Sequence, residues 1–340
     1  VEGSGEAQMT SSLASKFTIR DEFPAVAYEQ WRELAESALK GAPFERKLIT
    51  RTYEGVDIQP IYTRQDAQDE SDPLGFPGLT PFLRGTRPLG AALSGWDLRQ
   101  EHGHPDLETA NRQILADIEG GVTSLLLRLD GNVRRGVGPE VADGGDGIMA
   151  FGVDDLDVVL RDVNLSQVPV TLDAGAAFLP AAASLMGIWR RRDLANSLRG
   201  AFNADPLGTL AADGQLPVSL ATAFEQLVDL ASWTSHHYPH VTAVGVDTSP
   251  YHDAGATAVQ DLAFAVGTAV EYMRALTRSD LDVAQAAAQI QFRLGLGTHH
   301  FMAIAKLRAA RRLWARVGEV CGNGTPSAAM RIHARTSDRV

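Results

Sequence analysis

A short polar segment, residues 247–253, holds the densest group of side chains able to transfer protons or attack a substrate. It contains Asp247, Ser249, Tyr251, His252 and Asp253. A phenol and an imidazole beside two carboxylates can act as a general acid and a general base. A histidine that is simply hydrogen-bonded within a loop would have the same sequence, so both interpretations stay open on the residues alone.

The flanking residues predict how this segment is positioned. Residues 241–246 are rich in β-branched side chains, which favours a buried strand. After Ala254, apolar side chains recur at steps of three and four through Leu262, Val266 and Val270, which predicts a helix with one apolar face. In parallel α/β folds the loop after a strand carries the chemistry, so residues 247–253 are the first place to look for a site.

Two further groups of residues have chemistry that suits a ligand. Trp96 and Arg99 can clamp a planar or phosphorylated molecule, or merely anchor an extended segment. Four cations on one predicted helix can attract an anionic substrate, although such a run is also typical of a solvated face. They are Lys306, Arg308, Arg311 and Arg312.

Other common sites lack support in the sequence. The histidines occur as adjacent pairs at 236–237 and 299–300, and adjacent side chains point in different directions on a helix or strand. We therefore predict no metal site. Neither a Gly-x-Gly-x-x-Gly nor a Walker sequence is present, and Gly-x-Ser-x-Gly is absent too, so nucleotide binding and a serine nucleophile have no local signal.

The composition limits the classes of partner. The chain has 340 residues, 44% of them hydrophobic, and a formal net charge of −11, which argues against nucleic acid and anionic membranes as partners. No stretch is apolar enough to span a membrane, and residues 1–10 lack the pattern of a signal peptide. The single cysteine, Cys321, excludes a disulfide framework within the chain and fits the cytoplasm.

Six predicted strands alternate with helices, roughly 40 residues apart, which is typical of parallel βα units. The strands are predicted at residues 123–129, 168–172, 198–203, 241–246, 290–294 and 330–335. This pattern predicts an α/β protein with about six βα units; if the sheet is a closed (β/α)8 TIM-type barrel, as the family resemblance described below implies, the barrel is incomplete in this chain. Because a closed barrel needs eight, we expect the chain to be the N-terminal portion of a longer polypeptide.

Four regions are predicted along the chain. Residues 1–20 form a disordered leader, 21–75 an N-terminal arm, 76–106 an extended docking segment and 107–340 the partial barrel. In the arm, a helix over residues 22–39 precedes a hairpin of residues 48–53 and 56–62. The arm's apolar face, with Trp31, Leu34 and Leu39, is too small to stand alone and predicts a contact with another subunit.

Several longer motifs resemble one family. Residues 304–315, Ile-Ala-Lys-Leu-Arg-Ala-Ala-Arg-Arg-Leu-Trp-Ala, and residues 253–264 with Tyr272 look like those of adenosylcobalamin-dependent acyl-CoA mutases, specifically methylmalonyl-CoA mutase. Residues 84–85 and 96–100, Trp-Asp-Leu-Arg-Gln, resemble that family's Arg-Gly and Trp-Thr-Ile-Arg-Gln elements. The resemblance runs from about residue 23 to residue 337.

The resemblance implies a barrel through which acyl-CoA threads, and a separate cobalamin domain carrying Asp-x-His-x-x-Gly. That motif is absent here. Read without gaps, the family's catalytic tyrosine falls on Ala91, and its Tyr-His pair falls on Ser249 and Pro250, two residues before Tyr251 and His252.

Two other family positions have changed. The Asn and Glu that approach the adenosyl group fall on His299 and Ala303, and the substrate-holding Gln and Arg are replaced within residues 203–208. We therefore expect no catalytic residue in this chain. Tyr251 and His252 remain candidates for catalysis, and Trp96, Arg99 and His299 remain barrel-mouth candidates for cofactor binding.

The resemblance therefore implies the small, non-catalytic subunit of a heterodimeric methylmalonyl-CoA mutase. Its partner would be the large catalytic subunit, with acyl-CoA and adenosylcobalamin bound in the complex. Branched side chains in residues 125–129 and 241–246 are predicted to fill the barrel interior and so leave no room for pantetheine. The alternatives are an active acyl-CoA mutase using Tyr251 or His252, and an acyl-CoA binding module.

Overall fold

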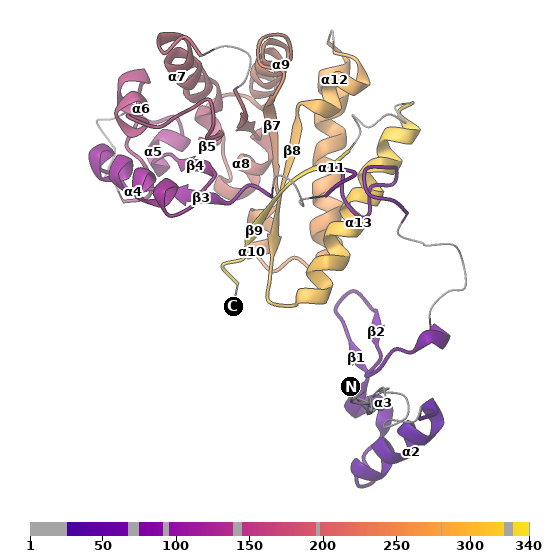
Figure 1. The fold of residues 1–340 in the computed structure, drawn as a ribbon. Helices are drawn as coiled ribbons and strands as arrows, with labels where there is room; N and C mark the ends of the chain where they lie inside the picture. The colour runs from indigo at the N-terminus through magenta and orange to yellow at the C-terminus, as the bar shows by residue number, and fades with distance from the viewer. Residues whose placement is uncertain are drawn as a thin grey trace, which may run out of the picture. The chain divides into compact units, whose positions relative to one another are not determined.

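The computed structural model describes residues 26–66, 75–90, 95–138, 145–194, 198–279, 281–322 and 329–339. The predicted leader, residues 1–20, and Ala91 lie outside the described residues. By their internal contacts the residues form two units, 1–71 and 72–340, and Figure 1 shows both as ribbons.

The first unit contains a helix and a small hairpin, as predicted, but both are shorter than predicted. Helix α2 (Tyr28–Ala38) precedes α3 (Phe44–Leu48), an unpredicted turn of helix, and β1 (Thr50–Arg51) pairs antiparallel with β2 (Asp57–Ile58). A 3-10 turn, η1 (Arg64–Asp66), follows. The unit has little core: α2 has no buried residue, and Trp31 lies edge-on to Phe44 with 6.1 Å between ring centroids.

The second unit is built on one sheet of seven parallel strands, in the order β3-β4-β5-β6-β7-β8-β9. They are β3 (Arg99–His102), β4 (Ser124–Arg128), β5 (Val170–Asp173), β6 (Gly200–Ala204), β7 (Val241–Asp247), β8 (Ile290–Leu296) and β9 (Arg331–Thr336). All six predicted strands are present. The seventh, β3, lies inside the segment predicted to be merely extended, and its sequence Arg-Gln-Glu-His carries no apolar alternation to reveal it.

Helices follow the strands and cover the outer side of the sheet (Figure 1). They are α4 (Leu107–Glu119), α5 (Gly131–Arg134), α6 (Val153–Val159), η3 (Gly175–Ala177), α7 (Phe178–Arg191), α8 (Pro206–Asp213), α9 (Leu220–His237), α10 (Ser249–Asp253), α11 (Ala258–Thr277), α12 (Val283–Ala288) and α13 (His300–Val320). The longer helices agree with the sequence pattern. The short ones α5, α8 and α10 were not predicted, and residues 249–253, expected to be a loop, form α10.

The apolar core lies between the sheet and its helices. Leu125, Leu127 and Leu129 of the β4 region belong to it, and on β8 Phe292 meets Trp314 of α13 with ring centroids 5.0 Å apart. The expectation that residues 125–129 fill the barrel interior with branched side chains is therefore wrong for three of the four leucines. Because side chains alternate along a strand, Leu125, Leu127 and Leu129 face the helices, while Leu126 shares the inner face with Arg128. On β7 the same alternation places Val241 and Ala243 on the face of Asp247, so the expectation is not overturned there.

The sheet is curled, so that its two ends approach each other. Arg293 on β8 contacts Glu101 on β3, although β4, β5, β6 and β7 lie between these strands in the sheet. The fold is thus an α/β half-barrel, an incomplete TIM-like barrel, as the sequence predicts. Within the described ranges, none of the helices combines the length and apolar character that crossing a membrane requires.

Candidate functional site

The inner face of the half-barrel holds a cluster of charged side chains centred on Arg293. Its Nη1 lies 3.2 Å from Asp173 Oδ2 of β5 and 3.2 Å from Asp247 Oδ2 of β7. Its Nη2 lies 3.3 Å from Glu101 Oε2 of β3. We call Arg293 and these three carboxylates the axial ion cluster. Although burial opposes it, the field of the carboxylates raises the pKa of Arg293.

The strand register explains why these residues meet. In parallel pairs, Arg128 is opposite Asp173, and Asp247 is opposite Arg293, so their side chains share the inner face. Arg128 also extends the cluster, because its guanidinium lies 3.7 Å from Glu101 and 2.9 Å from Asp146. The carboxylates are thus bound to arginines and are not free to act as general bases.

A second buried group joins the ends of β6 and β7 to α11. Asp205 is the N-cap of α8: its Oδ1 accepts from Gly208 N at 2.9 Å and from the Tyr272 hydroxyl at 2.5 Å. Its Oδ2 accepts from Asp247 N at 2.8 Å. Burial raises the pKa of Asp205 to about 6, and burial together with this carboxylate raises the pKa of Tyr272 well above its ordinary value. The sequence analysis missed Asp205, although Asp before Pro206 is a signal for a helix start.

The predicted site segment forms α10 at the C-terminal end of β7. Ser249 N donates to Asp247 Oδ1 at 2.8 Å, and the Ser249 hydroxyl is buried with no hydrogen-bond partner among the described residues. The Tyr251 ring stacks on Phe264 of α11, with centroids 4.2 Å apart. Burial and the charge of Asp205 raise the pKa of Tyr251. The ring of Tyr251 is therefore packed against a helix, which is a structural contact.

His252 connects α10 to the residues that follow β9. Its Nε2 lies 2.8 Å from Ser337 Oγ, and its Nδ1 lies 3.5 Å from Asp261 Oδ2 of α11. Burial and the nearby Lys306 lower the pKa of His252. Arg339 Nη1 donates to the His252 carbonyl at 2.8 Å. His252 thus takes part in holding three parts of the chain together.

Lys306 belongs to the same buried group, which we call the Asp261 group: Asp261, Lys306, His252 and Ser337. Its ammonium is paired with Asp261 and donates to the Gly295 carbonyl at 2.7 Å. Only 5% of its surface is exposed, so Lys306 is neither on a solvated face nor free to attract a substrate. The run of cations on this helix was interpreted either as attracting an anionic substrate or as a solvated face, and both interpretations are wrong for Lys306.

The structure does not bring the three barrel-mouth candidates together. Trp96 is 74% exposed and precedes β3, and Arg99 is the first residue of β3, where its Nε donates to Ser124 Oγ at 3.1 Å. His299 follows β8, at the opposite end of a parallel sheet, and accepts from Met302 N as the N-cap of α13. Ala303, in the first turn of α13, brings only a methyl group.

Two of the candidates already use a ring nitrogen within the chain: His252 Nε2 lies 2.8 Å from Ser337 Oγ, and His299 Nδ1 accepts from Met302 N. The described residues therefore show no assembled site for adenosylcobalamin. Over the ranges that the structure covers, no group of three or more His, Cys, Asp or Glu side chains is placed to hold a metal ion.

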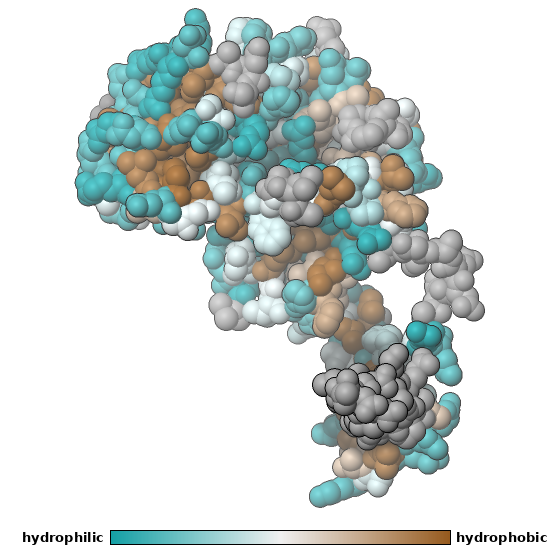
Figure 2. Space-filling view, in the orientation of Figure 1, coloured by the Kyte–Doolittle hydropathy of each residue, from teal (hydrophilic) through white to brown (hydrophobic). Residues whose placement is uncertain are grey.

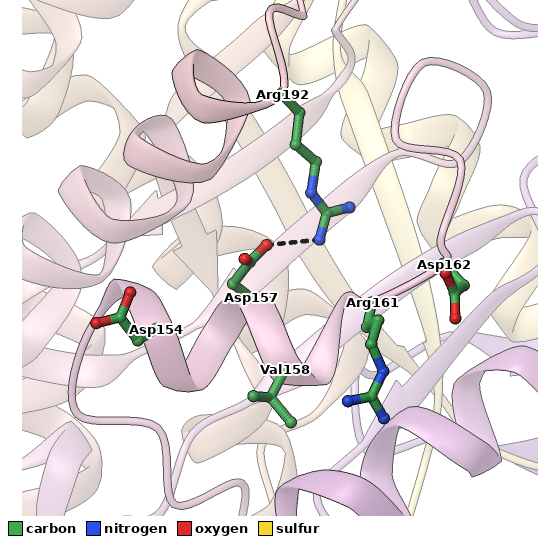
Figure 3. A pocket seen from close by; sticks show the side chains of 6 residues that line it. All are labelled: Asp154, Asp157, Val158, Arg161, Asp162 and Arg192. Atoms are coloured by element: carbon green, nitrogen blue, oxygen red, sulfur yellow. Dashed lines mark hydrogen bonds and ion pairs between the residues drawn. The ribbon is translucent and has the colours of Figure 1, made fainter.

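A hollow of about 470 Å³ lies on the outer helical layer, between α6 and α7 (Figure 3). It is lined by Asp154, Asp157, Val158, Arg161, Asp162 and Arg192. Four of its five charged residues are paired: Arg192 Nη2 lies 2.6 Å from Asp157 Oδ1, and Arg191 and Glu108 neutralise Asp154 and Arg161. The fifth, Asp162, is exposed and has no ion pair among the described residues. The hollow lies among helices of the outer layer and is separate from the inner face.

Comparisons with a family model and with individual proteins all identify similarity to methylmalonyl-CoA mutase. A family model described as methylmalonyl-CoA mutase matches residues 51–339. The chain is 40% identical to a methylmalonyl-CoA mutase small subunit of Streptomyces virginiae, over 93% of this chain and 48% of that protein. It is 33% identical to the small subunit of Propionibacterium freudenreichii subsp. shermanii, over 99% of this chain and 51% of that protein.

A more distant match is the mitochondrial methylmalonyl-CoA mutase of Macaca fascicularis, which is 28% identical over 91% of this chain and 42% of that protein. The chain therefore spans about half the length of the curated relatives it matches.

Proposed function

The chain belongs to the methylmalonyl-CoA mutase family, and from this premise we propose that it serves as the small, non-catalytic subunit of a heterodimeric mutase. With a large catalytic subunit it would support the interconversion of methylmalonyl-CoA and succinyl-CoA. The radical chemistry would be supplied by adenosylcobalamin bound outside the residues described here. Its relatives from bacteria and its single cysteine support a cytoplasmic location.

The axial ion cluster is the observation that carries this proposal. Arg293 is 9% exposed and is held by carboxylates from three strands across the interior of the half-barrel. An acyl-CoA chain lying along the axis would have to displace the guanidinium and leave its carboxylates unpaired, which is costly. A barrel filled in this way supports a scaffolding role.

The residues at the family's catalytic positions support the same role. In the gap-free comparison with the family, Ser249 and Pro250 stand where a phenol and an imidazole are expected, and Ala303 stands where a carboxylate is expected. None of the three replacements can transfer a proton near neutral pH or hold a thioester carbonyl as the original groups would. Tyr251 and His252, the nearest alternatives, are engaged with Phe264 and Ser337.

The N-terminal unit supports a partner subunit. Figure 2 shows hydrophobic side chains at its surface between hydrophilic ones. Leu34 is 70% exposed and Tyr53 is 99% exposed, and Val56 is exposed as well. A unit with so little core is stabilised when a partner buries its exposed apolar side chains. We therefore propose that it contacts the large subunit.

The test is turnover by defined assemblies. The full chain is expressed with and without a large-subunit homologue from the same organism, and conversion of methylmalonyl-CoA is measured with added adenosylcobalamin. We expect turnover only in the complex, and we expect Tyr251→Phe in this chain to leave its kcat unchanged. Turnover by this chain alone would overturn the proposal. Tight binding of CoA esters to this chain alone, measured by calorimetry, would favour a binding module instead.

A further inference from the structure

We draw no further inference here: the strongest candidate, the side-chain cluster of Ser337, His252 and Asp261 at the C-terminal ends of β7 and β9, belongs to the site already described, where these side chains hold α10 to α11 and to the residues after β9.

Discussion

Arg293 Nη2 lies 3.3 Å from Glu101 Oε2, although 192 residues separate them in the chain and four strands separate them in the sheet. The contact joins the two halves of the half-barrel across its interior. Arg293 neutralises the carboxylates that face it on the inner side of the sheet. This pairing explains how charged side chains are stable on the inner face, while the apolar core lies on the other face of the sheet, against the helices.

Replacing Arg293 should therefore destabilise the second unit. Arg293→Met leaves three partly buried carboxylates without their shared cation, and we expect a loss of about 2–4 kcal/mol in the free energy of unfolding. Urea denaturation followed by circular dichroism measures it. The control Arg316→Met removes an arginine from an exposed pair and should change stability by less than about 0.5 kcal/mol. Equal stability of both variants would show that the axial ion cluster does not hold the sheet.

The Tyr272 hydroxyl should contribute through two hydrogen bonds. It donates to Asp205 Oδ1 and accepts from Leu207 N at 2.9 Å, so Tyr272→Phe leaves a buried amide without its acceptor. We expect a loss of about 1–3 kcal/mol, measured by thermal or urea unfolding. Tyr53→Phe, at a side chain that is 99% exposed, is the matched control. An equal loss in the free energy of unfolding for Tyr53→Phe would contradict a stabilising role of the two hydrogen bonds of the Tyr272 hydroxyl.

Asp205 should make stability depend on pH. Its pKa is raised from 3.8 to about 6 in the folded chain, so the folded state holds the proton more tightly than the unfolded state. Its contribution is fully present below pH 3.8 and is lost as pH rises through about 6. Relative to Asp205→Asn, which does not titrate, the wild type should lose about 2 kcal/mol between pH 4 and pH 7. Stability curves of the two proteins that stay parallel over this range would contradict the shifted pKa.

Lys306 should be more important than its neighbours on α13. Lys306→Met leaves the fully buried Asp261 carboxylate without its cation, and we expect a loss of about 3–5 kcal/mol in the free energy of unfolding. Arg308→Met, two residues further along the same helix, removes an exposed charge and should have an effect within about 0.5 kcal/mol. If both substitutions behave alike, the buried pair does not stabilise the fold.

The proposed contact of the N-terminal unit can be tested with one side chain. Leu34→Asp should weaken capture of the large-subunit homologue by roughly tenfold or more, because it places a charge in an apolar contact. Deleting residues 21–62 should abolish capture. Glu33→Asp, at the adjacent position, should not change it. Undiminished capture after the deletion would refute the role of this unit.

The predictable part of the fold came from strands and helices with an apolar face. The β7 strand and the long helices α4, α9 and α11 have clear periodicity, and the structure contains them. Strand β3 has polar residues on both faces because one face meets the axial ion cluster, so no period of two in hydrophobicity exists to find.

The site was less accessible to sequence reasoning, since it depends on contacts between distant residues. His252 and Ser337 are 85 residues apart, and nothing local in either segment indicates that they meet. The run of leucines in residues 125–129 suggested a barrel interior filled with side chains, because the sequence does not show which leucines face inward. Only the strand register shows that Arg128 faces inward while Leu125 and Leu127 face the helices.

Asp261 is shared by Lys306 and His252, and His252 in turn contacts Ser337 just beyond β9. Three helices and the last described strand are therefore fastened at a single carboxylate. Because all of these contacts depend on one buried carboxylate, the positions of α10, α11 and α13 at this end of the half-barrel are coupled to the position of the segment after β9.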